Sequence, residues 1–167
     1  MTQAFKWYEI KARAGVAGVA ANGVDPAAQA AGRSAEIYIY GNIGDRWDEN
    51  GVVAADLVRE LAALDVDTIT LRINSYGGSV PDGLAIYNAL KRHKAAVDVQ
   101  VDGVAISCAG YIAMAGDTVT MADNAMLMIH APWGVAVGNS ADLREQADML
   151  DKYARSEERR VGKECLR

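Results

Sequence analysis

The feature that most constrains the fold of this chain is a strand, turn and helix pattern that occurs twice in succession. Residues 68–74 alternate apolar and polar side chains, as a half-buried strand does, and lead through the double glycine at 77–78 into residues with helical apolar spacing. Residues 97–101 alternate in the same way, and the sequence then predicts a break at Gly103, a turn at Ser107 and a helix of small apolar residues. Two such units predict parallel strands joined by helices.

Further elements of both kinds surround these two units. The patterns predict strands over 36–40, 118–121 and 126–130, a helix over 50–64 capped by Asp48 or Asn50, and a charged amphipathic helix over 141–153. Residues 79–82 read as a capping box with Pro81 in the first helical turn. The chain is therefore predicted to have an α/β fold. The glycine turn and the Ser107 turn should meet at the carboxyl edge of the sheet, where such folds bind ligands.

Length and charge exclude several classes of protein. The chain has 167 residues, of which 51% are hydrophobic, and this is enough for one domain with a core. Its formal net charge of -5 gives no support for nucleic-acid binding. The two cysteines, Cys108 and Cys165, provide no disulfide framework and favour a reducing compartment. Because no apolar run is long enough to span a bilayer and no signal peptide is evident, we expect a cytoplasmic protein without a membrane partner.

The residues at the predicted sheet edge have the chemistry of acyl transfer. A serine at a helix start is close to unpaired backbone N–H groups and the positive end of the helix dipole, which stabilise developing negative charge. His130 offers a base and the double glycine offers a further N–H donor. Taken singly, Ser107 is as well explained by an N-cap and His130 by a structural histidine, and His93 keeps the structural interpretation. The double glycine lacks the spacing of a nucleotide-binding loop, and we expect no metal site.

Several motifs in one order resemble a known family. The segments INSYGGSV, GVAISCAG and LMIHAP are similar, in this order, to the patterns INSPGGSV, GxAASxG and MIHQP of the Clp protease proteolytic subunit. The segment MAGD, which follows the second of them, is also similar to this family. The segments IYIYGNIG, LAIYNALKRHK and IHAPWG are most similar to those of the ClpP-related head maturation proteases of tailed phages and prophages. The resemblance covers about residues 36–153. It implies the crotonase-like fold of ClpP, with repeated β-α units, a parallel sheet and a protruding handle helix.

The resemblance also implies a role for individual residues. It makes Ser107 the nucleophile and His130 the general base of a serine peptidase. The backbone N–H groups of Gly78 and Cys108 would form the oxyanion hole, and the substrate would contact four further residues, namely Ser79, Val80, Pro132 and Trp133. Such an enzyme needs no cofactor.

Three residues depart from the family pattern, and one expected residue is missing. Tyr76 replaces the proline before the glycines and removes its fixed φ angle, Ile106 is bulkier than the usual alanine, and Cys108 replaces a methionine. By the family's spacing, the triad aspartate should lie beyond residue 167, so we expect a chain truncated at its C-terminus. An inactive fragment is therefore one expectation, because loss of the orienting acid lowers turnover by about four orders of magnitude in another serine protease fold.

The ends of the chain are expected to lie outside the peptidase domain. Residues 1–35 read as an N-terminal arm with an Ala/Gly-rich linker, residues 36–154 as the incomplete peptidase domain, and residues 155–167 as a non-native tail. The segment RSEERRVGKEC in that tail resembles the translation of a sequencing adapter.

The family resemblance implies a serine endopeptidase that acts on proteins or peptides, with phage capsid or scaffold proteins as the first choice of substrate. The alternatives are a housekeeping Clp peptidase that works with an ATPase unfoldase, a catalytically silent crotonase-fold scaffold, and a crotonase-type enzyme of acyl-CoA chemistry. The presence of both Ser107 and His130 argues against the last of these, because acyl-CoA chemistry needs no serine nucleophile. The resemblance further implies a homo-oligomeric ring.

Overall fold

A computed structural model describes residues 8–13, 32–44 and 54–164. Its centre is a six-stranded sheet in the order β1-β2-β3-β4-β5, with β6 also paired to β4. The strands are β1 (Tyr8–Arg13), β2 (Ser34–Tyr40), β3 (Thr68–Ser75), β4 (Ala96–Ile106), β5 (Thr118–Met121) and β6 (Met126–Met128). β1 is antiparallel to β2, whereas the other pairings are parallel. The prediction of an α/β fold with a mostly parallel sheet is confirmed.

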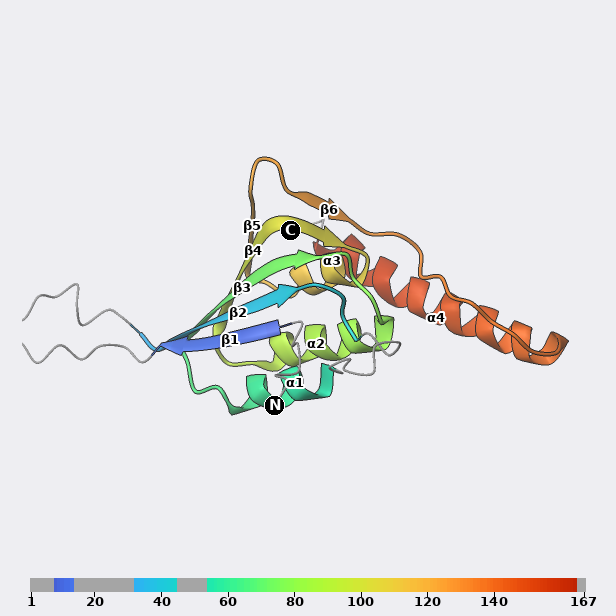
Figure 1. The fold of residues 1–167 in the computed structure, drawn as a ribbon, viewed down its shortest axis with the longest axis horizontal. Helices are drawn as coiled ribbons and strands as arrows, with labels where there is room; N and C mark the ends of the chain where they lie inside the picture. Colours follow the sequence, from blue (N-terminus) through green and yellow to red (C-terminus); the bar gives the residue numbers. More distant parts are fainter. Residues whose placement is uncertain (1–7, 14–31, 45–53, 165–167) are drawn as a thin grey trace, which may run out of the picture.

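Parallel strands need crossover connections, and three helices provide them here. α1 (Ala54–Ala63) connects β2 to β3, α2 (Val80–Arg92) connects β3 to β4, and α3 (Cys108–Ala113) connects β4 to β5, whereas α4 (Ser140–Glu164) follows the last strand. Figure 1 shows α1 and α2 together along one side of the sheet, whereas α4 extends away from it. The core lies between sheet and helices, where alternate strand residues such as Ile37, Ile39, Ile69 and Leu71 meet apolar helix residues such as Leu57 and Ile86.

The sheet is longer at β4 than the sequence indicates. The strand does not break at Gly103 but continues to Ile106, and its pairing with β3 shifts register between Ile73 and Ser75. The Asn74 side-chain oxygen accepts the Val104 N–H at 3.2 Å at this irregularity. The extension lets β4 pair with β5 along its first half and with β6 along its second half. It also sets the position at which Ser107 leaves the sheet.

The predicted helix caps differ from the observed ones. Ser79 precedes α2 but makes no side-chain capping hydrogen bond, so the predicted capping box is wrong, although Pro81 does lie in the first turn. Asp82, the other member of that box, accepts the Ala54 N–H at the start of α1 at 3.1 Å. The predicted caps Asp48 and Asn50 lie outside the described residues, as do residues 14–31 of the predicted arm.

The C-terminal helix is longer than predicted. We expected a helix over 141–153, but α4 continues to Glu164 and therefore includes most of the predicted tail. Its first turn is organised by Asn139, whose side-chain oxygen accepts the Ala141 N–H at 2.8 Å, as expected of a polar cap. None of the helices in the described part of the chain is both long and apolar enough to cross a membrane.

A cluster of charges closes the amino-terminal ends of the parallel strands. The Asp65 carboxylate pairs with Arg33, which precedes β2, and with Lys94, which precedes β4. Hydrogen bonds from Lys94 and then Arg33, together with their charges, lower the pKa of Asp65 below its ordinary value of 3.8. These pairs are exposed, so each contributes little alone. Together they connect three segments at the edge of the sheet opposite to the turns that follow β3 and β4.

Candidate active site

Ser107 lies at the junction between β4 and α3 in an unusual backbone conformation. Its φ is 58° and its ψ is -129°, and it is the non-glycine residue with positive φ in the described part of the chain. A residue other than glycine rarely adopts this region of φ and ψ unless its surroundings hold it there. The restraint is visible here, because the Ser107 N–H donates to the Met128 carbonyl at 2.8 Å and the Tyr111 N–H donates to the Ser107 carbonyl at 3.3 Å. The hydroxyl makes no capping hydrogen bond, so the N-cap explanation of Ser107 does not hold.

The glycine turn after β3 packs directly against this junction. A Cβ atom on Gly77 would lie 2.6 Å from the Ile106 carbonyl oxygen and 2.7 Å from the Ser107 Cβ, and the φ of Gly77 is 91°. Only glycine allows both the backbone conformation and this close approach. The same hypothetical Cβ would lie 3.2 Å from the Cys108 nitrogen, so the glycine turn and the first N–H of α3 are neighbours. The structure therefore brings the two turns together, as the sequence predicts.

The N–H of Gly78 is directed by a short parallel bridge to Ile43. The Ile43 N–H donates to the Gly77 carbonyl and the Ser79 N–H donates to the Ile43 carbonyl, both at 2.8 Å. In an extended segment successive residues turn their polar groups to opposite sides. Since Gly77 and Ser79 both bond to Ile43, the Gly78 N–H points to the side away from Ile43 and is not used by this bridge.

Hydrogen bonds around Ser75 also restrain the turn, in which Tyr76 stands where the family pattern has a proline. The Ser75 hydroxyl donates to the Gly41 carbonyl at 2.6 Å and accepts the Gly77 N–H at 3.1 Å, and the Gly41 N–H donates to the Asn74 carbonyl at 3.2 Å. Tyr76 lacks the fixed φ of the proline that it replaces. Hydrogen bonds to the segment after β2 restrain the turn instead.

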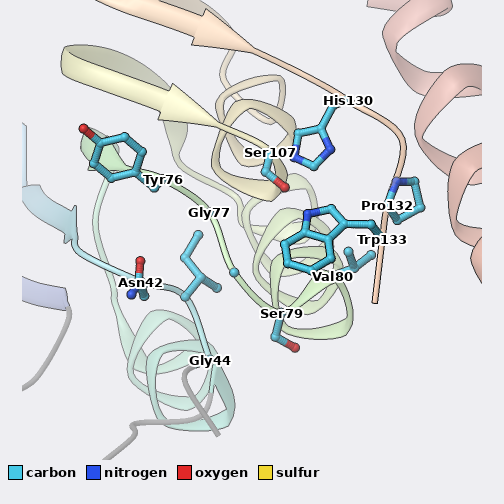
Figure 2. A pocket seen from close by; sticks show the side chains of 12 residues that line it. Asn42, Gly44, Tyr76, Gly77, Ser79, Val80, Ser107, His130, Pro132 and Trp133 are labelled. Carbon is cyan, nitrogen blue, oxygen red and sulfur yellow. The ribbon is translucent and has the colours of Figure 1, made fainter. Parts of the chain in front are cut away.

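His130 follows β6 and lies beside Ser107. Its Nδ1 lies 2.8 Å from the Ala131 carbonyl oxygen, and because a carbonyl only accepts, this nitrogen is the donor. The proton on Nδ1 leaves a lone pair on Nε2, as a general base requires. In Figure 2 one ring nitrogen of His130 is on the side of the Ser107 side chain. A neutral carbonyl therefore fixes the tautomer here, where a classical triad has a carboxylate.

Two aspartates, Asp117 and Asp142, have main-chain hydrogen-bond partners in the structure. Asp117 accepts the Val97 N–H at 2.8 Å, and Asp142 accepts the Asn139 N–H at 2.9 Å at the start of α4. Each of these carboxylates thus accepts a hydrogen bond from the main chain. His93 is structural, since its Nδ1 accepts the Ala95 N–H at 3.1 Å and its Nε2 lies 3.2 Å from the Leu64 carbonyl oxygen.

A cleft of about 520 Å³ connects the predicted site residues. Ser107 and His130 line the cleft together with Gly78 and the four residues for which substrate contact is predicted. Further lining residues come from the glycine turn and from the segment after β2. The whole set is Asn42, Ile43, Gly44, Tyr76, Gly77, Gly78, Ser79, Val80, Ser107, His130, Pro132 and Trp133. The Cys108 side chain is buried away from the cleft lining, so its backbone N–H is the part relevant to the site. The cleft thus contains side chains from both turns and from the segment after β6.

Comparison with known proteins shows the family of the chain. The sequence model of the family described as Clp protease matches residues 24–165. The chain belongs to the Clp protease family. A 103-residue region is 38% identical to the ATP-dependent Clp protease proteolytic subunit 1 of Synechococcus sp. (strain CC9902). This region is 60% of the chain and 52% of the relative, so the chain spans about half the length of this curated member of the family.

Sequence reasoning about this Clp protease family member missed the segment after β2. Asn42, Ile43 and Gly44 line the cleft, and Ile43 makes both backbone hydrogen bonds that hold the glycine turn. A signal was present, because IYIYGNIG ends a strand with two glycines and parallel strands end at the same edge. The pairing of Ile43 with Gly78 has no signal of its own, since it depends on a contact between residues 35 positions apart in the chain.

Proposed function

We propose that this chain carries the nucleophile and the base of a serine endopeptidase. The observation that carries the proposal is the Ser107 junction, where a serine hydroxyl that does not cap its helix is held at positive φ beside His130. Such a conformation is expensive for an ordinary residue, so it supports a functional role. Membership of the Clp protease family supports the same role.

The arrangement supports the following steps. His130 Nε2 takes the hydroxyl proton as Ser107 Oγ forms a bond to the carbonyl carbon of the peptide, and the carbonyl oxygen becomes an oxyanion. The Gly78 and Cys108 N–H groups donate to that oxyanion. The carbon–nitrogen bond then breaks and the departing amine takes the proton from His130. Water attacks the resulting acyl-serine in the same way, which releases the acid and restores the hydroxyl.

Active-site labelling tests this proposal. A fluorophosphonate probe should label the wild-type chain at Ser107 and should not label Ser107→Ala. His130→Ala should slow labelling by about 10²- to 10⁴-fold, the usual contribution of a general base. Ser140→Ala, which changes an exposed serine at the start of α4, is the control and should react like the wild type. Labelling that persists in Ser107→Ala, or that never occurs while a control peptidase reacts, would exclude this serine as the nucleophile.

We further propose proteins of a phage capsid or scaffold as the substrates. The similarity of IYIYGNIG and IHAPWG to head maturation proteases supports this choice. A housekeeping peptidase paired with an ATPase unfoldase is the second candidate, which the name of the Synechococcus relative favours. Cleavage of a purified capsid precursor without ATP would support the first. Degradation that requires an unfoldase and ATP would support the second.

We also propose that the chain acts as a homo-oligomer. Large apolar side chains outside the cleft are exposed along β5, β6, the segment after β6 and α4, namely Val119, Met121, Met126, Met128, Val135, Val137, Leu143 and Met149. Exposed apolar patches of this kind mark interaction surfaces. Sedimentation of the purified chain tests this proposal, and a monomer at micromolar concentration would contradict it.

A further inference from the structure

The cleft beside Ser107 is lined without fixed charge. Its twelve lining residues include no aspartate, glutamate, lysine or arginine among those the structure describes. A charged substrate side chain that entered the cleft would lose water without gaining an ion-pair partner, and this carries a free-energy cost. The cleft therefore favours peptides with uncharged side chains next to the reacting carbonyl.

Tyr76 is an aromatic wall on one side of the nucleophile. Its side chain is 70% exposed, yet its backbone is held from both sides by the hydrogen bonds of Ser75 and by the Ile43 bridge. An aromatic ring on a fixed backbone binds with little loss of conformational entropy, because it has few rotatable bonds. Figure 2 shows the ring on the same side of the cleft as Asn42.

Trp133 is a second aromatic wall on the other side. It is 77% exposed, and Figure 2 shows its indole close to Val80 and Pro132, with Ser107 between it and Tyr76. Both aromatic residues line the same cleft as Ser107. A peptide whose carbonyl carbon lies at the Ser107 hydroxyl must extend in two directions.

We propose that Tyr76 and Trp133 select apolar or aromatic substrate side chains on opposite sides of the bond that is cleaved. This inference rests on the proposed peptidase function, because that function places the reacting carbonyl at Ser107. Tyr76 is then a specificity-determining residue, and the tyrosine that replaces the family's proline gives this chain a contact that a proline ring does not provide. Stacking of aromatic rings contributes enough to change relative affinity by about 3- to 10-fold.

Peptides that bind in a single register test the inference. Fluorescein-labelled heptapeptides with a central α-ketoamide add reversibly to a serine hydroxyl and extend on both sides of it. One series varies the side chain before the ketone among Phe, Lys and Glu, and a second series varies the side chain after the amide. Dissociation constants are measured by fluorescence anisotropy for the full wild-type chain, Tyr76→Ala, Trp133→Ala and the matched control Tyr76→Phe.

The wild type should bind the Phe peptides more tightly than the Lys and Glu peptides in both series. Tyr76→Ala should reduce that preference about 3- to 10-fold in one series, Trp133→Ala should do so in the other, and Tyr76→Phe should retain it. The inference is overturned if Tyr76→Ala alters neither series, alters both equally, or alters the same series as Trp133→Ala. Fluorophosphonate labelling measured in parallel separates the two questions. Absent labelling with selective binding contradicts the peptidase function alone, and normal labelling without selectivity contradicts the inference alone.

Discussion

At the scale of single residues, the site depends on the backbone conformations of Gly77 and Ser107. Gly77 has a φ of 91° and no room for a Cβ, whereas Ser107 has a φ of 58° despite its side chain. Because Gly77 has no Cβ, it leaves room for Ser107 in its strained backbone conformation. The free-energy cost of Ser107 is therefore offset by neighbours that hold it, chiefly the Met128 carbonyl and the turn at Gly77.

A substitution at Gly77 should show how tightly this point is packed. Gly77→Ala places a Cβ 2.6 Å from a backbone oxygen in a conformation that alanine rarely adopts, and we expect a loss of at least about 2 kcal/mol in the free energy of unfolding. Urea denaturation measures this loss. Gly134→Ala is the matched control, because a Cβ there meets nothing within 4 Å, and it should change stability by no more than about 0.5 kcal/mol. Equal stability of the two variants would show that the turn can rearrange.

At the scale of elements, Asp82 joins the starts of α1 and α2. The residue is buried, its Oδ1 accepts the Ala54 N–H at 3.1 Å, and its Oδ2 has no hydrogen-bond partner among the described residues. A Cβ on Gly44, a residue of the cleft lining, would lie 2.3 Å from that second oxygen. Asp82 therefore packs α1, α2 and the segment after β2 into one unit behind the cleft.

Variants of Asp82 should separate its capping role from its charge. Asp82→Ala removes the acceptor for the Ala54 N–H and should lower the free energy of unfolding by about 0.5 to 2 kcal/mol, as the loss of a cap does. Asp82→Asn keeps an oxygen acceptor and should lose less. Hydrogen exchange at the Ala54 amide and urea denaturation measure the two effects. Equal losses for the two variants would show that the charge, rather than the oxygen acceptor of the cap, stabilises this region.

The elements themselves were predictable from local pattern, whereas their ends and caps were not. Alternation identified β2, β3 and the first part of β4, and helical spacing identified α1 and α2. Gly103 reads as a break, but β4 continues because Asn74 on β3 satisfies the Val104 N–H. Asp82 reads as a local capping residue, but it caps α1 instead. The turns at Gly78 and Ser107 were predicted to meet because parallel strands share an edge, and Ile43 was missed because only a tertiary contact places it in the cleft.

At the scale of the whole molecule, one end of the sheet carries the cleft and the other end carries charge. The cluster of Arg33, Asp65 and Lys94 joins the segments that lead into β2, β3 and β4. Because the cations lower the pKa of Asp65 in the folded state, its contribution to stability is present above the ordinary value of 3.8 and is lost as the pH falls through the lowered value. Acid should therefore weaken this end of the sheet.

Thermal unfolding at two pH values tests this expectation. The melting temperature of the wild type should fall more between about pH 7 and about pH 3 than that of Asp65→Asn, which has no carboxylate to protonate at this position. Asp123→Asn, which changes an exposed aspartate in the turn between β5 and β6, should behave like the wild type. A fall in Asp65→Asn as large as in the wild type would assign the acid sensitivity to other groups.

The parts of the molecule that hold Ser107 and His130 differ in their burial. Ser107 is followed by the buried residues Cys108 and Ala109 of α3, whereas His130 begins a segment whose residues 133–139 are exposed. Local stability follows burial, so the segment that begins at His130 should open at a lower free energy than the junction at Ser107. We therefore expect faster hydrogen exchange at the backbone amides of residues 133–139 than at those of Cys108 and Ala109.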